Sequence, residues 1–190
     1  MSIIDLSLVL DMLKRVSDDA LRGEIVKYGL RISDAKFALA FSAYGVTRWL
    51  TSLPHKVLSI NAPSLPTEEL DRIRWSAVFF FRAYTTFIFM RSEHLERGLD
   101  TIPEDSPIRP FRDFFRSGSI RRGEDTIAQH IRNALAHGTV EIENIENLSI
   151  AVFHDRDWQG KIALSQFVDG LCEEIFRFYC AAFETRQGAA

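Results

Sequence analysis

The residues best suited to phosphate chemistry lie together in one short segment of the C-terminal half. The string HIRNALAHG runs from His130 to Gly138 and holds Arg132, Asn133 and His137 within six residues. A guanidinium group can pair with two phosphate oxygens, and an imidazole transfers protons near neutral pH. No other stretch of the chain combines these residue types. The segment therefore predicts chemistry on a phosphodiester or another phosphate-bearing ligand.

Each of the three side chains has a role in RNA cleavage without a metal ion. The 2′-hydroxyl must lose a proton, the leaving 5′-oxygen must gain one, and the charge on the phosphate must be stabilised. His137 suits proton transfer because the unperturbed pKa of histidine is about 6.5, and a helix C-terminus favours its cationic form. Arg132 could hold the phosphate. Asn133, four residues before His137, could orient the imidazole or bind phosphate.

The spacing of Arg132 and His137 also constrains the site. Five residues correspond to about 140° around an ideal helix, so the two side chains do not share a face. A cleft that combines the motifs of two copies of the chain would relieve this mismatch. The alternative interpretation is structural, with Arg132 paired to an acid and His137 acting as a helix cap.

Further cationic residues near the motif could contact an RNA backbone. We assign this weaker role to Arg116, Arg121, Arg122 and His130; Arg109 and Arg112 extend the arginine-rich stretch. The alternative is a solvated surface whose arginines pair with acids, with His130 a satisfied surface histidine. The chain has no HExxH motif and no cysteine–histidine spacing typical of zinc sites, so we predict no metal and no cofactor.

The composition excludes several classes of protein. The 190 residues suit one domain, residues 1–190, and a formal net charge of −3 does not fit a polycation that coats nucleic acid. Cys172 and Cys180 would lie about 12 Å apart on one helix, too far for a mutual disulfide. The N-terminus lacks the basic start of a signal peptide, and the most apolar window, residues 78–90, is too short to span a bilayer. We therefore expect a cytoplasmic protein without a membrane segment.

The hydrophobic pattern predicts a mainly α protein. We expect an up-and-down bundle of roughly four to six helices, with a small antiparallel β-hairpin between the motif helix and the C-terminal helix. Helices are predicted over residues 3–13, 21–30, 33–53, 67–98, 111–116, 124–137 and 165–185, a hairpin over 139–155, and a turn at 157–160 before a short third strand. Gly138 should end the motif helix. The apolar centre of 67–98 suits either the core or a subunit interface.

Arg-Asn-x-x-x-His on a late helix of a helical domain resembles the HEPN superfamily. The signature of that superfamily is an arginine, a polar residue, a few further residues and a histidine, here Arg132, Asn133 and His137. The string IRNALAHG, followed by a hairpin and an amphipathic C-terminal helix, is similar to one bacterial branch. The resemblance covers the C-terminal part of the chain, while the first hundred residues match only as generic helices.

The resemblance implies a homodimeric helical bundle that acts as a metal-independent endoribonuclease. In such dimers the arginine and histidine of both protomers face each other in a cleft on the two-fold axis. RNA is then the substrate, the products carry 2′,3′-cyclic phosphate, and an antitoxin or another defence protein is the expected partner. Other members of the superfamily are inactive modules that bind a nucleotide, RNA or a partner protein, which is the alternative here. One toxin subgroup has a regulatory tyrosine two residues after the histidine, where this chain has Thr139.

Overall fold

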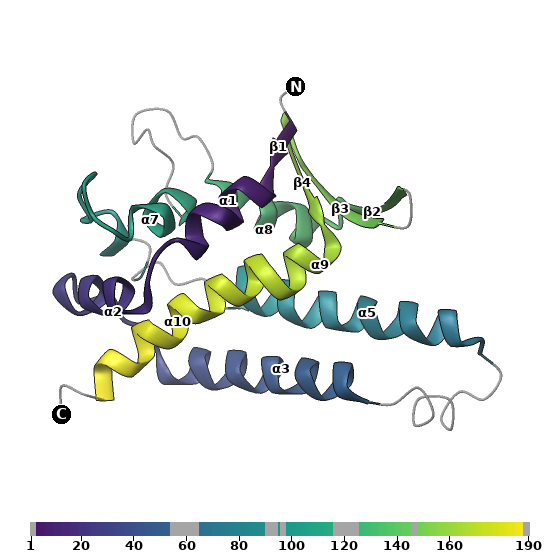
Figure 1. Ribbon diagram of the computed structural model, residues 1–190, viewed down its shortest axis with the longest axis horizontal. Coiled ribbons are helices and arrows are strands. Elements are labelled where there is room, and N and C mark those ends of the chain that lie inside the picture. Colours follow the sequence, from purple (N-terminus) through teal and green to yellow (C-terminus); the bar gives the residue numbers. More distant parts are fainter. Residues whose placement is uncertain are drawn as a thin grey trace.

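The protein is mainly helical, with a small four-stranded mixed sheet (Figure 1). The computed structural model describes residues 3–53, 65–89, 95, 98–115, 126–145 and 148–187, and the side chains of these residues up to 183. The mainly helical prediction is confirmed. The predicted hairpin is present, but it belongs to a larger sheet.

The chain begins with a strand, so the helix predicted from residue 3 starts later. Strand β1 (Ile3–Asp5) precedes helix α1 (Leu6–Lys14). Asp5 caps α1 by accepting hydrogen bonds from the backbone N–H and the hydroxyl of Ser7, at 3.0 and 2.7 Å. The cap fixes the start of the helix. The extended residues before it pair in parallel with strand β4 (Trp158–Ala163), an interaction that local sequence cannot indicate.

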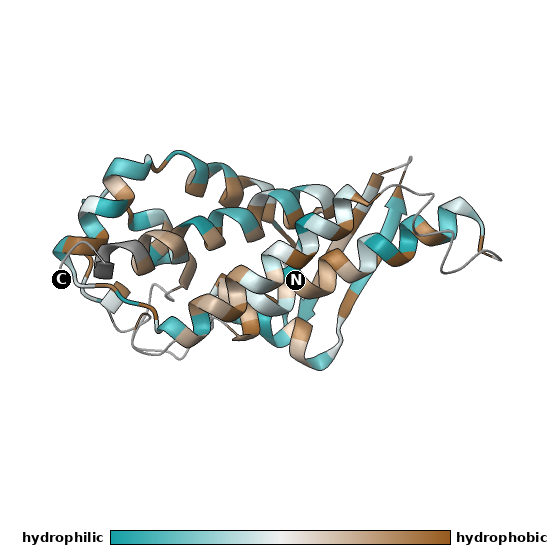
Figure 2. Ribbon diagram, turned by 90° about the horizontal axis from the view of Figure 1, so that it is seen from below, coloured by the Kyte–Doolittle hydropathy of each residue, from teal (hydrophilic) through white to brown (hydrophobic). Residues whose placement is uncertain are grey.

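In the described part of the N-terminal half, three helices follow near the predicted positions; residues 90–94 and 96–97 of the helix predicted over 67–98 lie outside the described residues. Helix α2 (Asp18–Lys27) leads to α3 (Asp34–Ser52), which lies beside α5 (Thr67–Tyr84) and runs in the opposite direction (Figures 1 and 2). A π-helical turn, η1 (Thr85–Phe89), continues α5. The apolar residues at the centre of the continuous α5–η1 helix have different environments. Val78, Ala83 and Phe87 are buried, whereas Trp75, Phe80 and Phe81 are partly exposed.

The sheet has the strand order β1-β4-β3-β2. Strands β2 (Val140–Ile145), β3 (Leu148–Asp155) and β4 are antiparallel neighbours, and only β1 joins in parallel. The turn predicted at 157–160 is wrong from Trp158 onward, because that residue opens β4. The tight connection uses Arg156, whose φ of 52° lies in the left-handed region, together with Asp157.

The C-terminal part is one helical run that crosses the molecule (Figure 1). It consists of α9 (Leu164–Gln166), the π-helical η2 (Phe167–Leu171) and α10 (Cys172–Gln187). Five large apolar side chains of this run are buried: Phe167, Leu171, Ile175, Phe178 and Tyr179. This run therefore supplies a large share of the hydrophobic core.

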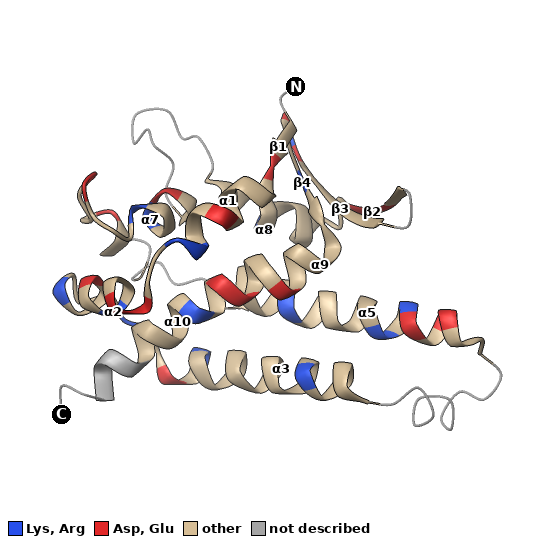
Figure 3. Ribbon diagram, in the orientation of Figure 1, with Lys and Arg blue, Asp and Glu red and all other residues tan. Residues whose placement is uncertain are grey.

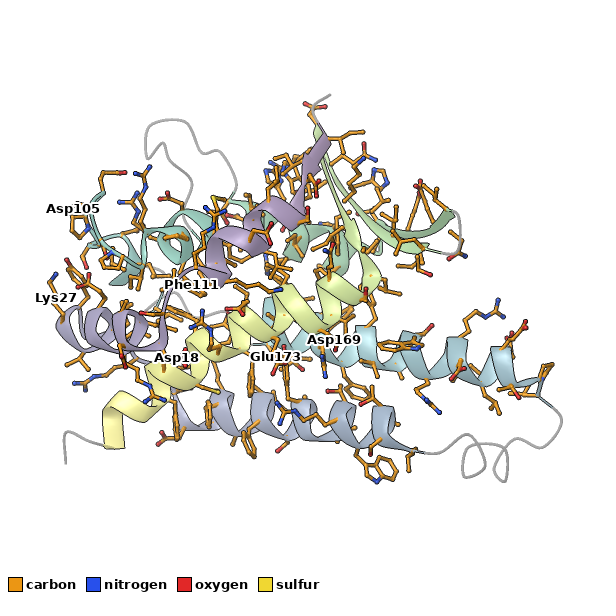
Figure 4. The ribbon with its side chains drawn as sticks, viewed as in Figure 1. Asp18, Lys27, Asp105, Phe111, Asp169 and Glu173 are labelled. Carbon is orange, nitrogen blue, oxygen red and sulfur yellow. The ribbon has the colours of Figure 1, made fainter. Side chains whose placement is uncertain are left out.

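Polar links fix the helices around that core. The buried Arg82 of α5 donates to the Thr47 hydroxyl on α3 at 3.1 Å and to the Val168 carbonyl in η2 at 3.0 Å, and it pairs with Asp169 (Figure 4). Arg177 of α10 pairs with Asp18 at the start of α2. Among the described residues, no helix is long and apolar enough to cross a membrane.

Candidate functional site

The motif lies on helix α8 (Ile127–His137), whose start is set by a threonine cap. The Thr126 hydroxyl accepts the backbone N–H of Gln129 at 2.9 Å, which satisfies one of the free donors of the first turn. The helix was predicted from residue 124; it begins at Ile127, and residues 124 and 125 lie outside the described part of the chain.

The end of α8 confirms the role predicted for Gly138. This glycine has a φ of 68°, in the left-handed region. Its N–H donates to the Leu135 carbonyl at 3.3 Å, and that of Thr139 donates to the Ala134 carbonyl at 2.9 Å. This pair of bonds is a Schellman motif. Because these bonds and the hydroxyl of Tyr84, 2.8 Å from the Leu135 carbonyl, satisfy the helix end, the side chain of His137 is not needed as a cap.

His137 is exposed to solvent. Among the described residues its imidazole has no hydrogen-bond or ion-pair partner. The side chain is therefore free to bind or protonate a ligand, and the capping interpretation does not apply to it.

A buried aspartate organises the opposite part of the motif. Asp155, the last residue of β3, is 8% exposed and accepts Nδ1–H of His130 at 2.8 Å and Nδ2–H of Asn133 at 3.0 Å. Burial raises the pKa of Asp155, but the hydrogen bonds from His130 and Asn133 outweigh it, so this pKa lies below its ordinary value. The carboxylate thus ties α8 to the sheet and fixes the His130 ring with its proton on Nδ1.

Trp158 completes this arrangement from strand β4. Its indole stacks on the His130 imidazole with a centroid distance of 4.8 Å and an interplanar angle of 6°. The stack needs a glycine beside it: a Cβ on Gly160 would lie 2.3 Å from the indole ring. The pairing of Asp155 with Trp158 across the β3–β4 turn places both side chains on the same face of the sheet.

The position of Asn133 differs from the role expected for it. Its amide was expected to orient His137 or bind phosphate, but it donates to Asp155. Its carbonyl oxygen is 3.5 Å from Nη1 of Arg132, at the limit of a hydrogen bond. Asn133 therefore belongs to the Asp155 group and helps to position His130, one turn earlier on the same helix.

Arg132 faces another side of α8 from His137. It lines a small cavity of about 40 Å³ together with Thr86 of η1, Gln129 of α8 and neighbouring apolar side chains. The structure thus agrees with the helical spacing, which separates the two side chains by about 140°. One chain does not bring the guanidinium and the exposed imidazole to a single point.

The arginine-rich stretch is only partly described. Arg109 pairs with Glu104 and Asp113, at 3.3 and 3.0 Å. Arg112 is 4% exposed and binds the same two acids and the Ile102 carbonyl. Both pair with acids, as in the alternative interpretation, but only Arg109 lies on the surface. Basic and acidic residues alternate around α7 (Arg109–Phe115; Figure 3). The positions predicted to bind RNA phosphates, Arg116, Arg121 and Arg122, lie outside the described residues.

Sequence reasoning did not identify Asp155 and Trp158 as partners of the motif. The usable signal was the short β3–β4 connection, because residues paired across such a turn share a face. Within the described part of the chain, no three His, Cys, Asp or Glu side chains gather in a group that could hold a metal ion.

Comparison with models of protein families, with curated proteins and with solved structures finds no match for this chain.

Proposed function

We propose that this protein is a metal-independent endoribonuclease of HEPN type that works as a homodimer through the exposed face of α8. The observation that carries the proposal is His137, an exposed imidazole at a helix C-terminus with no partner among the described residues, five residues after Arg132. The proposal includes the finer features of the resemblance: a single up-and-down bundle over residues 1–190, a cytoplasmic setting, and a defence or toxin–antitoxin context.

The chemistry assigns one task to each group. The RNA 2′-hydroxyl loses its proton and attacks the adjacent phosphorus, the bond to the 5′-oxygen breaks, and that oxygen takes up a proton. His137 as a cation donates the proton to the leaving oxygen. Arg132 binds the non-bridging phosphate oxygens and stabilises the added charge. The products are a 2′,3′-cyclic phosphate and a free 5′-hydroxyl.

His130 is the group best placed to accept the proton of the 2′-hydroxyl. Asp155 holds the proton on Nδ1, which leaves Nε2 as the basic nitrogen. His130 and His137 are seven residues apart, so they lie about 20° apart around α8 and about 10.5 Å apart along it. Asn133 and Trp158 hold the His130 ring in place, as a fixed base requires. The sequence predicts His130 as a weak phosphate ligand or, alternatively, as a satisfied surface histidine, and the role proposed here goes beyond both.

A dimer would bring an Arg132 and a His137 side chain together, which a single chain does not do. Arg132 and His137 of one chain face different sides of α8, so the proposal requires a two-fold axis that brings the partner's Arg132 to His137. The cleft on this axis would then contain two catalytic sets, each with groups from both protomers. RNA is the substrate, and an antitoxin or other defence protein is the partner that would cover the cleft.

A second candidate is a non-catalytic module that binds a nucleotide, RNA or a partner protein on the same face. His130 and Asn133 both donate to the buried Asp155. This network joins helix to sheet and so has a structural value that needs no catalysis, which favours a non-catalytic module.

An RNA-cleavage assay in EDTA distinguishes the two functions. The wild-type protein should cut single-stranded RNA and leave 2′,3′-cyclic phosphate ends, and His137→Ala should lose at least ~100-fold in rate while remaining folded. His154→Ala is the matched control. Side chains alternate along β3, so His154 lies on the face opposite that of Asp155. Unchanged cleavage by a folded His137→Ala variant would refute the mechanism. Tight binding of RNA without turnover by the wild type would favour the binding module.

A further inference from the structure

Strand β2 forms an open edge of the sheet. In the order β1-β4-β3-β2 it has a neighbour on one side only, and Figure 1 shows it as the outermost strand. Residues 141–145 are all exposed, and no described residue pairs with the outer side of the strand. An open edge of this kind can accept one further strand.

The alternation of hydrogen-bonded and non-bonded pairs between β2 and β3 shows which backbone groups of β2 face outward. The N–H of His154 donates to the Thr139 carbonyl at 3.0 Å, so this pair is hydrogen-bonded between the two strands. Bonded and non-bonded pairs alternate in an antiparallel ladder. With the observed register, Glu141 and Glu143 bond to β3, and the N–H and C=O groups of Val140, Ile142 and Asn144 point to the open edge.

An apolar groove lies on the sheet face beside this edge. It has a volume of about 840 Å³ between α5 and the ends of β2 and β3. Trp75, Phe79 and Phe80 of α5 form one wall, and Ile142 and Leu148 form the other. Ile142 is 46% exposed and faces the groove from the edge strand itself. A strand added to β2 would direct every second side chain into this groove.

The other face of β2 is acidic. Glu141 and Glu143 project there, and the side chain of Glu141 is 68% exposed. A second copy of β2 is disfavoured in the two central registers, because residues opposite each other share a face. A two-fold axis at Ile142 opposes Glu141 to Glu143, and one at Glu143 opposes that residue to itself. Lysine or arginine residues suit these positions.

We propose that β2 is a docking site for an extended peptide segment of a partner protein, with apolar side chains that enter the groove and alternate basic side chains that face Glu141 and Glu143. The peptide pairs antiparallel to β2 through the outward groups of Val140, Ile142 and Asn144. This site is distinct from the α8 face and does not depend on nuclease activity.

A short synthetic probe tests the backbone pairing. An acetylated and amidated Lys-Val-Lys-Val-Lys peptide should bind, with shifts of the amide signals of β2 in NMR spectra and slower hydrogen exchange at Val140, Ile142 and Asn144. The valine amides of the docked peptide face β2, so N-methylation of both valines should weaken binding by about 10-fold or more. N-methylation of two lysines is the matched control and should have little effect.

Charge reversal tests the acidic face. Glu143→Lys should weaken binding of the lysine–valine peptide and favour its glutamate–valine counterpart. Asp105→Lys is the control, since this exposed acid lies at the opposite end of the molecule (Figure 4). His137→Ala should bind the peptide as the wild type does, which separates this site from the proposed nuclease. No binding to the wild type, equal loss with both methylation patterns, or equal effects of the two charge reversals would overturn the proposal.

Discussion

At the scale of single residues, Asp155 does more than any charged group of the motif itself to shape the site. Its carboxylate accepts from both His130 and Asn133 and is almost fully buried. His137, by contrast, has no described partner, so its contribution to stability should be small. The residues that position the site and the residues proposed to react are therefore separate, and they can be tested separately.

Replacement of Asp155 should reveal the value of this carboxylate and its pH dependence. Asp155→Asn should lower the free energy of unfolding by about 1–3 kcal/mol at pH 7, since it weakens two charge-assisted hydrogen bonds. The pKa of Asp155 is lowered in the folded state, so the stabilisation exists above the unfolded pKa of about 3.9 and disappears as the pH falls through the folded pKa. Urea denaturation at pH 7 and below pH 4 should show the difference between wild type and variant shrinking in acid.

The control for this experiment is Asp157→Asn, which alters an exposed aspartate in the β3–β4 turn. It should change stability by less than ~0.5 kcal/mol. A difference between wild type and Asp155→Asn that stays constant down to the lowest pH would show that the ionised carboxylate is not the stabilising form.

Gly138 gives a prediction about the backbone alone. Gly138→Ala should cost about 1 kcal/mol of stability, because its φ of 68° disfavours a side chain while no atom lies within 4 Å of the new Cβ. Thermal unfolding measures the loss. Gly45→Ala, in the interior of α3 and equally free of contacts, should have the opposite sign and stabilise by roughly 0.5–1 kcal/mol. Equal effects of the two substitutions would contradict the assigned backbone conformation.

At the scale of elements, the site depends on the junction of α8 with the β3–β4 hairpin. The helix provides the imidazoles, and the hairpin provides the carboxylate and the indole that hold one of them. The tight turn at Arg156 brings Asp155 and Trp158 together. Packing of Ile131, Ala134 and Leu135 in the core fixes the rotation of α8 above the sheet.

Gly160 tests this junction, because its lack of a side chain makes room for Trp158. A Cβ at this position would lie 2.3 Å from the indole ring, so Gly160→Ala should displace the ring from His130 and destabilise the protein by roughly 1–3 kcal/mol. Near-ultraviolet circular dichroism should show a changed tryptophan band. Trp158→Phe combined with Gly160→Ala should recover part of the stability, since the smaller ring relieves the clash. An unchanged tryptophan band in a stable Gly160→Ala variant would disprove this packing.

At the scale of the whole molecule, the proposed dimer makes a quantitative prediction. If each of the two catalytic sets combines Arg132 of one protomer with His137 of the other, a mixture of inactive Arg132→Ala and His137→Ala proteins regains activity. Random exchange yields half mixed dimers with one intact set each, so about one quarter of the wild-type rate should return. Co-refolding the two variants and assaying RNA cleavage in EDTA measures it. Light scattering on the same sample establishes whether the protein is dimeric; a monomer, or no recovery after exchange, would contradict the composite cleft.

Local sequence features indicated the helical class, most helix positions and the end of the motif helix. These are local properties: apolar residues recur with helical period, Pro and Gly interrupt it, and Gly138 tolerates the left-handed conformation that a side chain disfavours. The same local rules indicated that Arg132 and His137 occupy different faces of one helix. They also predicted the hairpin at approximately its observed position.

The contacts of the motif residues depend on the tertiary structure. The pairing of β1 with β4 joins residues more than 150 positions apart, and a strand as short as β1 has no periodicity of its own to indicate it. The contacts of Asp155 with His130 and Asn133, and the stack of Trp158 on His130, depend on where the hairpin packs against α8. The side chain of Asn133 donates to Asp155, because a buried carboxylate without hydrogen-bond donors there would be costly. Distance along the chain carries no information about such contacts. The sequence therefore indicated the candidate residues of the motif but not Asp155, which holds His130 and Asn133.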